Sequence, residues 1–118
     1  MKRTLIILGL SALATPAHAD DRVGTLQQGR YECGMPGDAA GKAWVVDPDK
    51  AFEILGASSY RNAQGRGTYL RRGDRIIFTR GPMKDMQLER LSSGLLQQVE
   101  GDGSMGRMRC HRVGRRAD

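Results

Sequence analysis

The sequence predicts an all-β fold: a small antiparallel meander or barrel-like domain of about eight short strands that holds one disulfide. Three observations predict it. Short segments rich in β-branched and aromatic residues recur along the chain, turn-forming residues separate them at hairpin spacing, and one cysteine lies near each end of this series. No long segment has the apolar period of a helix.

The elements follow one another in a regular order. We expect strands at residues 30–33, 43–47, 52–55, 67–71, 75–80, 86–91, 95–99 and 107–112. The segments between them are rich in glycine, proline, aspartate and serine, as in Pro36-Gly37-Asp38, Asp47-Pro48-Asp49 and Gly101-Asp102-Gly103. A short helix at residues 49–55, which the Asp-Pro-Asp sequence would cap, is an alternative for that segment.

Side-chain alternation supports the strands. Tyr31 and Cys33 share one face of the first strand, and Arg30 and Glu32 share the other. Half-buried antiparallel strands produce this pattern, because one face packs on the core and the other meets solvent. We therefore expect the apolar face of each strand to line a single core.

The first nineteen residues have the features of an export signal. Lys2 and Arg3 precede an apolar stretch at residues 5–14, and Ala17-His18-Ala19 matches the small-x-small cleavage pattern. The mature chain is predicted to start at Asp20, which lacks the thiol of a lipoprotein anchor, and the apolar stretch is too short to span a bilayer. We expect a periplasmic or secreted protein with a signal peptide at 1–19, a flexible lead-in at 20–28, one β domain at 29–113 and a basic tail at 114–118.

Export favours a disulfide between Cys33 and Cys110, the two cysteines of the chain. Cys33 lies in the first predicted strand and Cys110 in the last. These strands become neighbours if the meander closes, so the disulfide would link the two ends of the sheet. Closing a loop of about 77 residues should stabilise the fold by roughly 4 kcal/mol.

Arginine supplies most of the positive charge. The net charge is +6, and loss of Lys2 and Arg3 with the signal leaves the mature chain at about +4. The guanidinium group pairs in two-pronged fashion with carboxylate or phosphate. The anion-binding candidates are Arg66, Arg71, Arg72, Arg107 and Arg109. The alternative is that these arginines form solvated faces that protect the edges of the sheet. Export, and the lack of aromatic residues among the arginines in the sequence, disfavour nucleic acid as the partner.

The sequence shows no catalytic constellation. His111 is the one histidine of the mature chain, and its neighbour Cys110 should point to the opposite face of the strand, so the two cannot act on one metal or substrate. The Gly101–Gly106 segment fits G-x-G-x-x-G, but a strand follows it where a dinucleotide site needs a helix. We therefore expect a non-enzymatic protein without cofactor or metal, with a small hydrolase as an alternative.

Four short motifs follow one another along the chain: Gly29-x-Tyr31-x-Cys33, Gly67-Thr68-Tyr69, Phe78-Thr79-x-Gly81-Pro82 and Cys110-x-Arg112. In the order of these motifs the chain resembles small exported bacterial β proteins of unassigned function. The Tyr-x-Cys start, the Arg72-Gly73-Asp74 turn and the late cysteine are also similar, more weakly, to periplasmic inhibitors of C-type lysozyme, which form small antiparallel barrels. That resemblance aligns residues 64–69 with the inhibitory loop of the family, with Tyr69 in register.

Together these features predict a binding module outside the cytoplasm. The first hypothesis is recognition of an anionic envelope component, either a polymer or an acidic protein, by the arginines. The alternative from the resemblance is inhibition of a lysozyme-like hydrolase. Both hypotheses leave the oligomeric state open.

Overall fold

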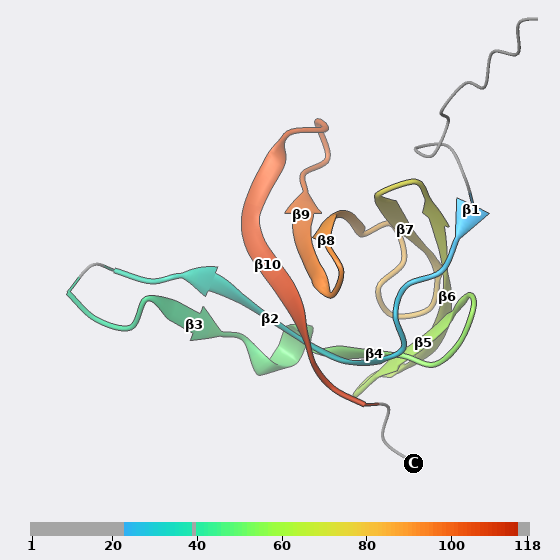
Figure 1. Ribbon diagram of the computed structural model, residues 1–118, viewed down its shortest axis with the longest axis horizontal. Helices are drawn as coiled ribbons and strands as arrows, with labels where there is room; N and C mark the ends of the chain where they lie inside the picture. Colours follow the sequence, from blue (N-terminus) through green and yellow to red (C-terminus); the bar gives the residue numbers. More distant parts are fainter. Residues whose placement is uncertain (1–22, 39, 116–118) are drawn as a thin grey trace, which may run out of the picture.

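The chain folds into ten β-strands and one short 3-10 turn in the computed structural model, which describes residues 23–38 and 40–115 (Figure 1). The signal peptide predicted at 1–19 lies outside the described residues. The strands are β1 (Val23–Gly24), β2 (Gly29–Pro36), β3 (Trp44–Val46), β4 (Phe52–Ile54), β5 (Ser59–Asn62), β6 (Gly65–Arg72), β7 (Arg75–Arg80), β8 (Gln87–Ser92), β9 (Leu95–Val99) and β10 (Met105–Gly114).

Eight of these strands close into an up-and-down barrel. Around the barrel the order is β6-β5-β4-β2-β10-β9-β8-β7, and pairing of β6 with β7 completes the ring. Every pairing is antiparallel, which confirms the predicted all-β barrel-like fold. Closure leaves none of these eight strands as a free edge of the ring.

The disulfide joins the first and last strands of the barrel. Cys33 on β2 and Cys110 on β10 are directly opposite each other in register, and their sulfurs are 2.04 Å apart. Both cysteines are fully buried. The predicted link between the two ends of the sheet is confirmed.

Alternating side chains from the strands fill the barrel, as the sequence predicts. Phe78 is fully buried at the centre of an aromatic cluster, with ring centroids 4.9 Å from Tyr60 and 5.6 Å from Phe52. Phe52 stacks in turn on Tyr31 at 5.1 Å. Few aromatic residues occur in the chain, and these four meet in one place, so they supply much of the large apolar surface that the core buries.

Strand β3, which the sequence predicts among the eight, lies outside the ring. It pairs with the end of β2, and the two strands form a hairpin arm, residues 34–38 and 40–46, that projects from the barrel (Figure 1). The eighth position of the ring belongs to β5, which the sequence analysis did not predict. Tyr60 is the one large apolar residue of β5, so its sequence lacks the alternation that identifies a strand.

The segment at 49–55 divides between two structures. The side chain of Asp47 accepts a hydrogen bond from the Asp49 backbone N–H at 3.1 Å and caps a single 3-10 turn, η2 (Pro48–Lys50). The chain is extended again at Ala51 and continues as β4. The capping expected of a helix is therefore present, but the strand replaces the helix after one turn.

The described part of the predicted lead-in at 20–28 packs on the barrel. Its residues Val23–Gly24 form β1 beside β6, and Leu26 is 4% exposed. The Leu26 backbone N–H donates to the Tyr69 hydroxyl at 3.0 Å. Arg71 holds the same segment, because its guanidinium donates to the carbonyl of Thr25. These contacts join the segment to the domain predicted to start at residue 29.

Candidate anion-binding surface

Alternate residues of β10 place a row of basic side chains on the outer wall of the barrel. Arg107 and Arg109 are exposed, whereas the residue that follows each of them, Met108 and Cys110, is buried. His111 follows on the outer face. Among the described residues, neither guanidinium forms an ion pair or a hydrogen bond. Both positive charges are therefore available to an anionic partner.

Trp44 lies next to this row. The arm brings its indole to the wall, with the ring centroid 6.1 Å from that of His111 in an edge-on arrangement. Trp44, Leu95, Arg109 and His111 line an open pocket of about 220 Å³ with mostly apolar walls. The pocket thus combines an aromatic surface with a cationic rim.

Gly34 allows this close approach. A Cβ at position 34 would press on the backbone carbonyl of Val45 and lie 3.0 Å from the indole Nε1 of Trp44. The Nε1 atom is itself buried and has no hydrogen-bond partner among the described residues. A side chain larger than hydrogen at position 34 would therefore move the tryptophan from its place beside Arg109.

Trp44 is the residue of this surface that sequence analysis missed. It was assigned only to a strand, because nothing in its local sequence indicates which other strand its side chain contacts. Its being the single tryptophan of the chain was the one available signal. The structure also changes one premise of the sequence analysis, since an aromatic side chain does lie beside Arg109 of β10.

The other predicted arginines lie on β6. Arg66 and Arg72 are exposed and unpaired among the described residues. Arg71 instead has a structural role: its Nε donates to the Gly73 carbonyl at 2.6 Å, and its Nη1 donates to the Thr25 carbonyl. Those bonds compete directly with any anion, so Arg71 is a poor ligand-binding residue.

The two arginine groups do not form one surface. In the ring, β6 and β10 are separated by β5, β4 and β2 in one direction and by β7, β8 and β9 in the other. Three strands on either side place them across the barrel from each other (Figure 1). Merging of the two groups, which the sequence left open, does not occur.

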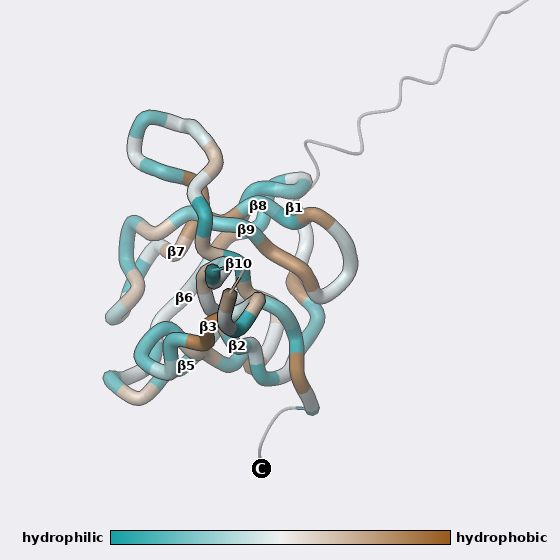
Figure 2. The backbone as a smooth tube through the Cα atoms, turned by 90° about the vertical axis from the view of Figure 1, so that its left-hand side faces the viewer, coloured by the Kyte–Doolittle hydropathy of each residue, from teal (hydrophilic) through white to brown (hydrophobic). Residues whose placement is uncertain are grey.

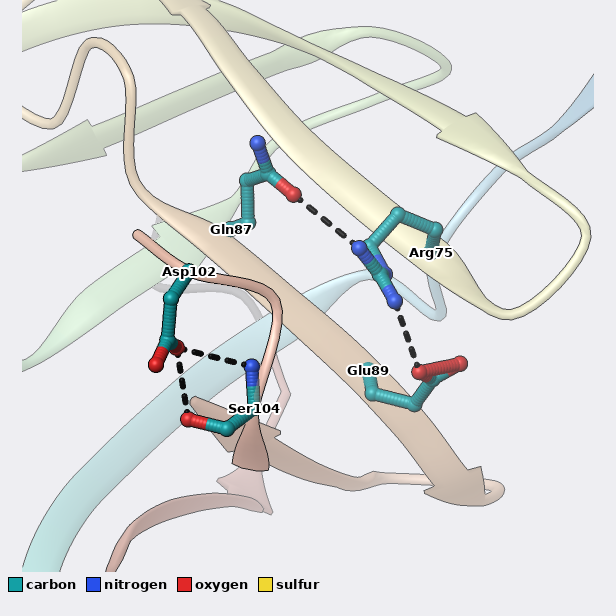
Figure 3. Close-up of polar contacts among 5 residues, drawn as sticks. All are labelled: Arg75, Gln87, Glu89, Asp102 and Ser104. Carbon is teal, nitrogen blue, oxygen red and sulfur yellow. Dashed lines mark hydrogen bonds and ion pairs between the residues drawn. The ribbon is translucent and has the colours of Figure 1, made fainter. Parts of the chain in front are cut away.

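A polar ladder crosses the outer wall between them. Next to Arg72, Arg75 on β7 donates to Glu89 at 3.2 Å and to Gln87 at 3.1 Å (Figure 3). These are contacts between partly exposed groups, which stabilise the fold little. Their effect on the surface charge is larger, because the Glu89 carboxylate offsets the charge of Arg75. Arg72, which is opposite Arg75 in the pairing of β6 with β7, keeps its own positive charge.

A second pocket, of about 430 Å³, opens over β2, β4 and β5. Its wall includes Arg30, Glu53 and Arg61. Glu53 is 7% exposed and accepts a hydrogen bond from Arg61 Nε at 2.7 Å. Positive and negative groups are mixed here, so this pocket is less suited to an anionic polymer than the β10 row.

The glycine-rich segment before β10 forms the turn of the β9–β10 hairpin. Asp102 accepts bonds from the Ser104 N–H at 3.0 Å and the Ser104 hydroxyl at 2.6 Å (Figure 3). These hydrogen bonds stabilise the carboxylate and hold the pKa of Asp102 below its usual range. The segment is thus a hairpin turn, as the sequence analysis predicts, followed by a strand.

Residues 64–69, aligned above with the inhibitory loop of lysozyme inhibitors, occupy the β5–β6 turn and the first half of β6. Tyr69 is 2% exposed, and its hydroxyl donates to the Gly56 carbonyl at 3.0 Å. Burial raises the pKa of this phenol. Tyr69 is therefore a core residue, and the exposed residues of the stretch are Gln64 and the cationic Arg66.

Comparison with known proteins adds no further information on the site: no family model, curated protein or solved structure matches this chain. Within the described residues, no three His, Cys, Asp or Glu side chains are grouped so as to hold a metal ion. The same residues contain no helix of the length and apolar character needed to cross a bilayer.

Proposed function

We propose that this chain is a non-enzymatic binding module of the periplasm or the extracellular medium, and that it recognises an anionic cell-envelope polymer through the β10 row. The surface consists of Arg107, Arg109, His111 and Trp44. The observation that carries the proposal is a pair of exposed guanidinium groups on β10 that have no ion pair among the described residues, one of which, Arg109, lines an aromatic pocket. Guanidinium groups bind phosphate or carboxylate, and the indole offers a flat surface to the polymer's uncharged part.

The disulfide supports the proposed location, because such bonds persist in oxidising compartments outside the cytoplasm. The open form of the pocket at Arg109 supports a surface that binds an extended polymer rather than a deep site for one small molecule. Binding of this kind weakens as salt rises, since mobile ions screen exposed charges over about 10 Å at 0.1 M.

Fluorescence of the single tryptophan provides a direct test. Purified protein is titrated with lipopolysaccharide and, separately, with a phosphate-rich wall polymer, each at low and high salt. We expect Trp44 emission to change on binding and the affinity to fall at high salt. Reversal of both charges in R107E/R109E should weaken binding at least tenfold, the change that corresponds to about 1.4 kcal/mol.

The matched control is R66E/R72E, which makes the same change of charge on the opposite side of the barrel. It should retain the affinity of the unmodified protein, apart from the general effect of net charge that both variants share. Equal losses in the two variants would remove the assignment to the β10 row. Shortening of the polymer during incubation would instead indicate a hydrolase.

Inhibition of a lysozyme-like hydrolase is the alternative function, and Arg66 is the exposed charged residue of the aligned stretch that would enter an enzyme cleft. An activity assay with C-type lysozyme at micromolar protein tests it. Loss of lysozyme activity that R66E relieves would favour inhibition over polymer binding.

A further inference from the structure

The arm presents an unprotected strand edge to solvent. Strand β3 pairs with β2 on one side, and among the described residues it has no partner on the other. It contains no charged residue and no proline, the features with which proteins commonly protect such edges. In Figure 2, which views the molecule from the side on which the arm projects, the hydrophobic brown of β3 lies in front of the barrel.

The hydrogen bonds of the arm show which backbone groups of β3 are used. The Asp47 N–H donates to the Cys33 carbonyl at 2.8 Å, and the Gly37 N–H donates to the Ala43 carbonyl at 3.0 Å. In an antiparallel pair, alternate residues direct both backbone groups at the partner. The odd-numbered residues from 43 to 47 therefore point their N–H and C=O groups at β2.

Trp44 and Val46 consequently direct their N–H and C=O groups away from β2, toward the open edge. Val45 between them is 50% exposed and pairs in register with Met35, which is 41% exposed. These two residues form a small apolar patch on one face of the arm. The edge thus offers free hydrogen-bonding groups together with apolar side chains.

We propose that β3 pairs with β3 of a second copy of this chain, antiparallel and two-fold symmetric about Val45. In this register Trp44 of each copy is opposite Val46 of the other, so residues with free backbone groups meet and exchange both N–H···O bonds. Val45 meets its own counterpart at the axis. Aromatic and β-branched residues paired in this way across strands are favourable, and the two Met35–Val45 patches become one.

The charges that flank β3 favour a second copy as the occupant. Lys42 lies before the strand, and Asp47 and Asp49 lie after it. Because the two strands run in opposite directions, Lys42 of each copy comes to the acidic end of the other. The edge is thus complementary to itself in charge, in hydrogen bonding and in apolar contacts, which a two-fold interface requires.

Dimerisation would also affect ligand binding, a consequence that rests on the proposed function. In the proposed pairing Trp44 uses its backbone in the β3–β3 ladder, and its side chain lines the pocket of the β10 surface. The symmetric pairing therefore brings two anion-binding surfaces to one side of the dimer. A polymer long enough to contact both surfaces would bind the dimer more tightly than a polymer that contacts one surface.

Sedimentation velocity over a range of protein concentrations tests the proposal. We expect a concentration-dependent dimer in the unmodified protein. V45K, which places a like charge at the axis, should weaken the dimer at least tenfold. A40K is the matched control, because it adds the same charge to the exposed turn of the arm away from the edge, and its dimer should persist.

A cysteine at the axis gives an independent measurement. Opposed residues without mutual hydrogen bonds have Cα atoms about 4.5 Å apart, within reach of a disulfide, so V45C should form a covalent dimer on mild oxidation far faster than A40C. A monomer at all concentrations up to about 1 mM, a dimer unchanged by V45K, or equal cross-linking of both cysteine variants would each overturn the proposal. Polymer binding by monomeric V45K with reduced avidity would leave the proposed function in place.

Discussion

Reduction of the Cys33–Cys110 disulfide should remove a large part of the stability of this fold. The bond connects residues 77 positions apart, at opposed positions of the strands that close the barrel. In the chain-entropy model, a loop of that length lowers the free energy of folding by about 4.5 kcal/mol. Domains of this size have about 5–15 kcal/mol in total, so the reduced protein should be marginally stable.

The assay is urea unfolding of the oxidised and the reduced protein, followed by the fluorescence of Trp44 and by circular dichroism. With a slope of about 1.5 kcal/mol per molar urea, we expect the midpoint to fall by about 3 M on reduction. The C33A/C110A variant separates two contributions, because it lacks the cross-link and also the buried sulfur atoms, whereas the reduced protein lacks only the cross-link.

A midpoint that moves by less than about 0.5 M, in protein whose thiols are shown to be fully reduced, would refute the loop-closure argument. That result would mean that the ladder between β2 and β10 holds the barrel closed on its own, or that the unfolded chain is already compact. A reduced protein that is more stable than the oxidised protein would contradict the argument in the same way.

Three further predictions follow from the structure. Burial raises the pKa of the Tyr31 and Tyr69 phenols, so the folded state holds these protons more tightly than the unfolded state. The contribution of the two phenols to stability is therefore complete below about pH 10 and is lost as the pH rises above it. Urea midpoints that stay constant up to about pH 11 would contradict this prediction. G34A should displace the indole of Trp44, shifting its emission and weakening polymer binding, while circular dichroism of the barrel stays unchanged. F78A removes the fully buried ring at the centre of the aromatic cluster and should cost about 3–5 kcal/mol in urea unfolding, whereas F78L should cost clearly less.

The pattern of single strands was predictable because it depends on neighbouring residues. Tyr31 and Cys33 face the core as their alternation with Arg30 and Glu32 predicts, and most hairpin turns fall where glycine, proline and aspartate cluster. Strand β5 was missed for the same reason, since its sequence has little alternation. It forms because β4 and β6 on its two sides complete its hydrogen bonds.

The candidate site was predictable only in part. The exposure of Arg107 and Arg109 follows from the alternation along β10, so the sequence identified this pair. It also proposed Arg71, whose guanidinium the structure finds bonded to the carbonyls of Thr25 and Gly73. Bonds of that kind join segments distant in the chain, and no local pattern predicts them.

The amino-acid sequence by itself determined an all-β chain, its main turns and the pairing of its two cysteines, because strand alternation, turn chemistry and cysteine count are local or compositional properties. Only the tertiary structure decided that two arginine groups lie across the barrel from each other and that Trp44 lies beside Arg109. The first fact depends on how many strands separate β6 from β10 in the closed ring, and the second on the packing of the Trp44 indole over Gly34. Both are set by contacts between residues that are not neighbours in the sequence.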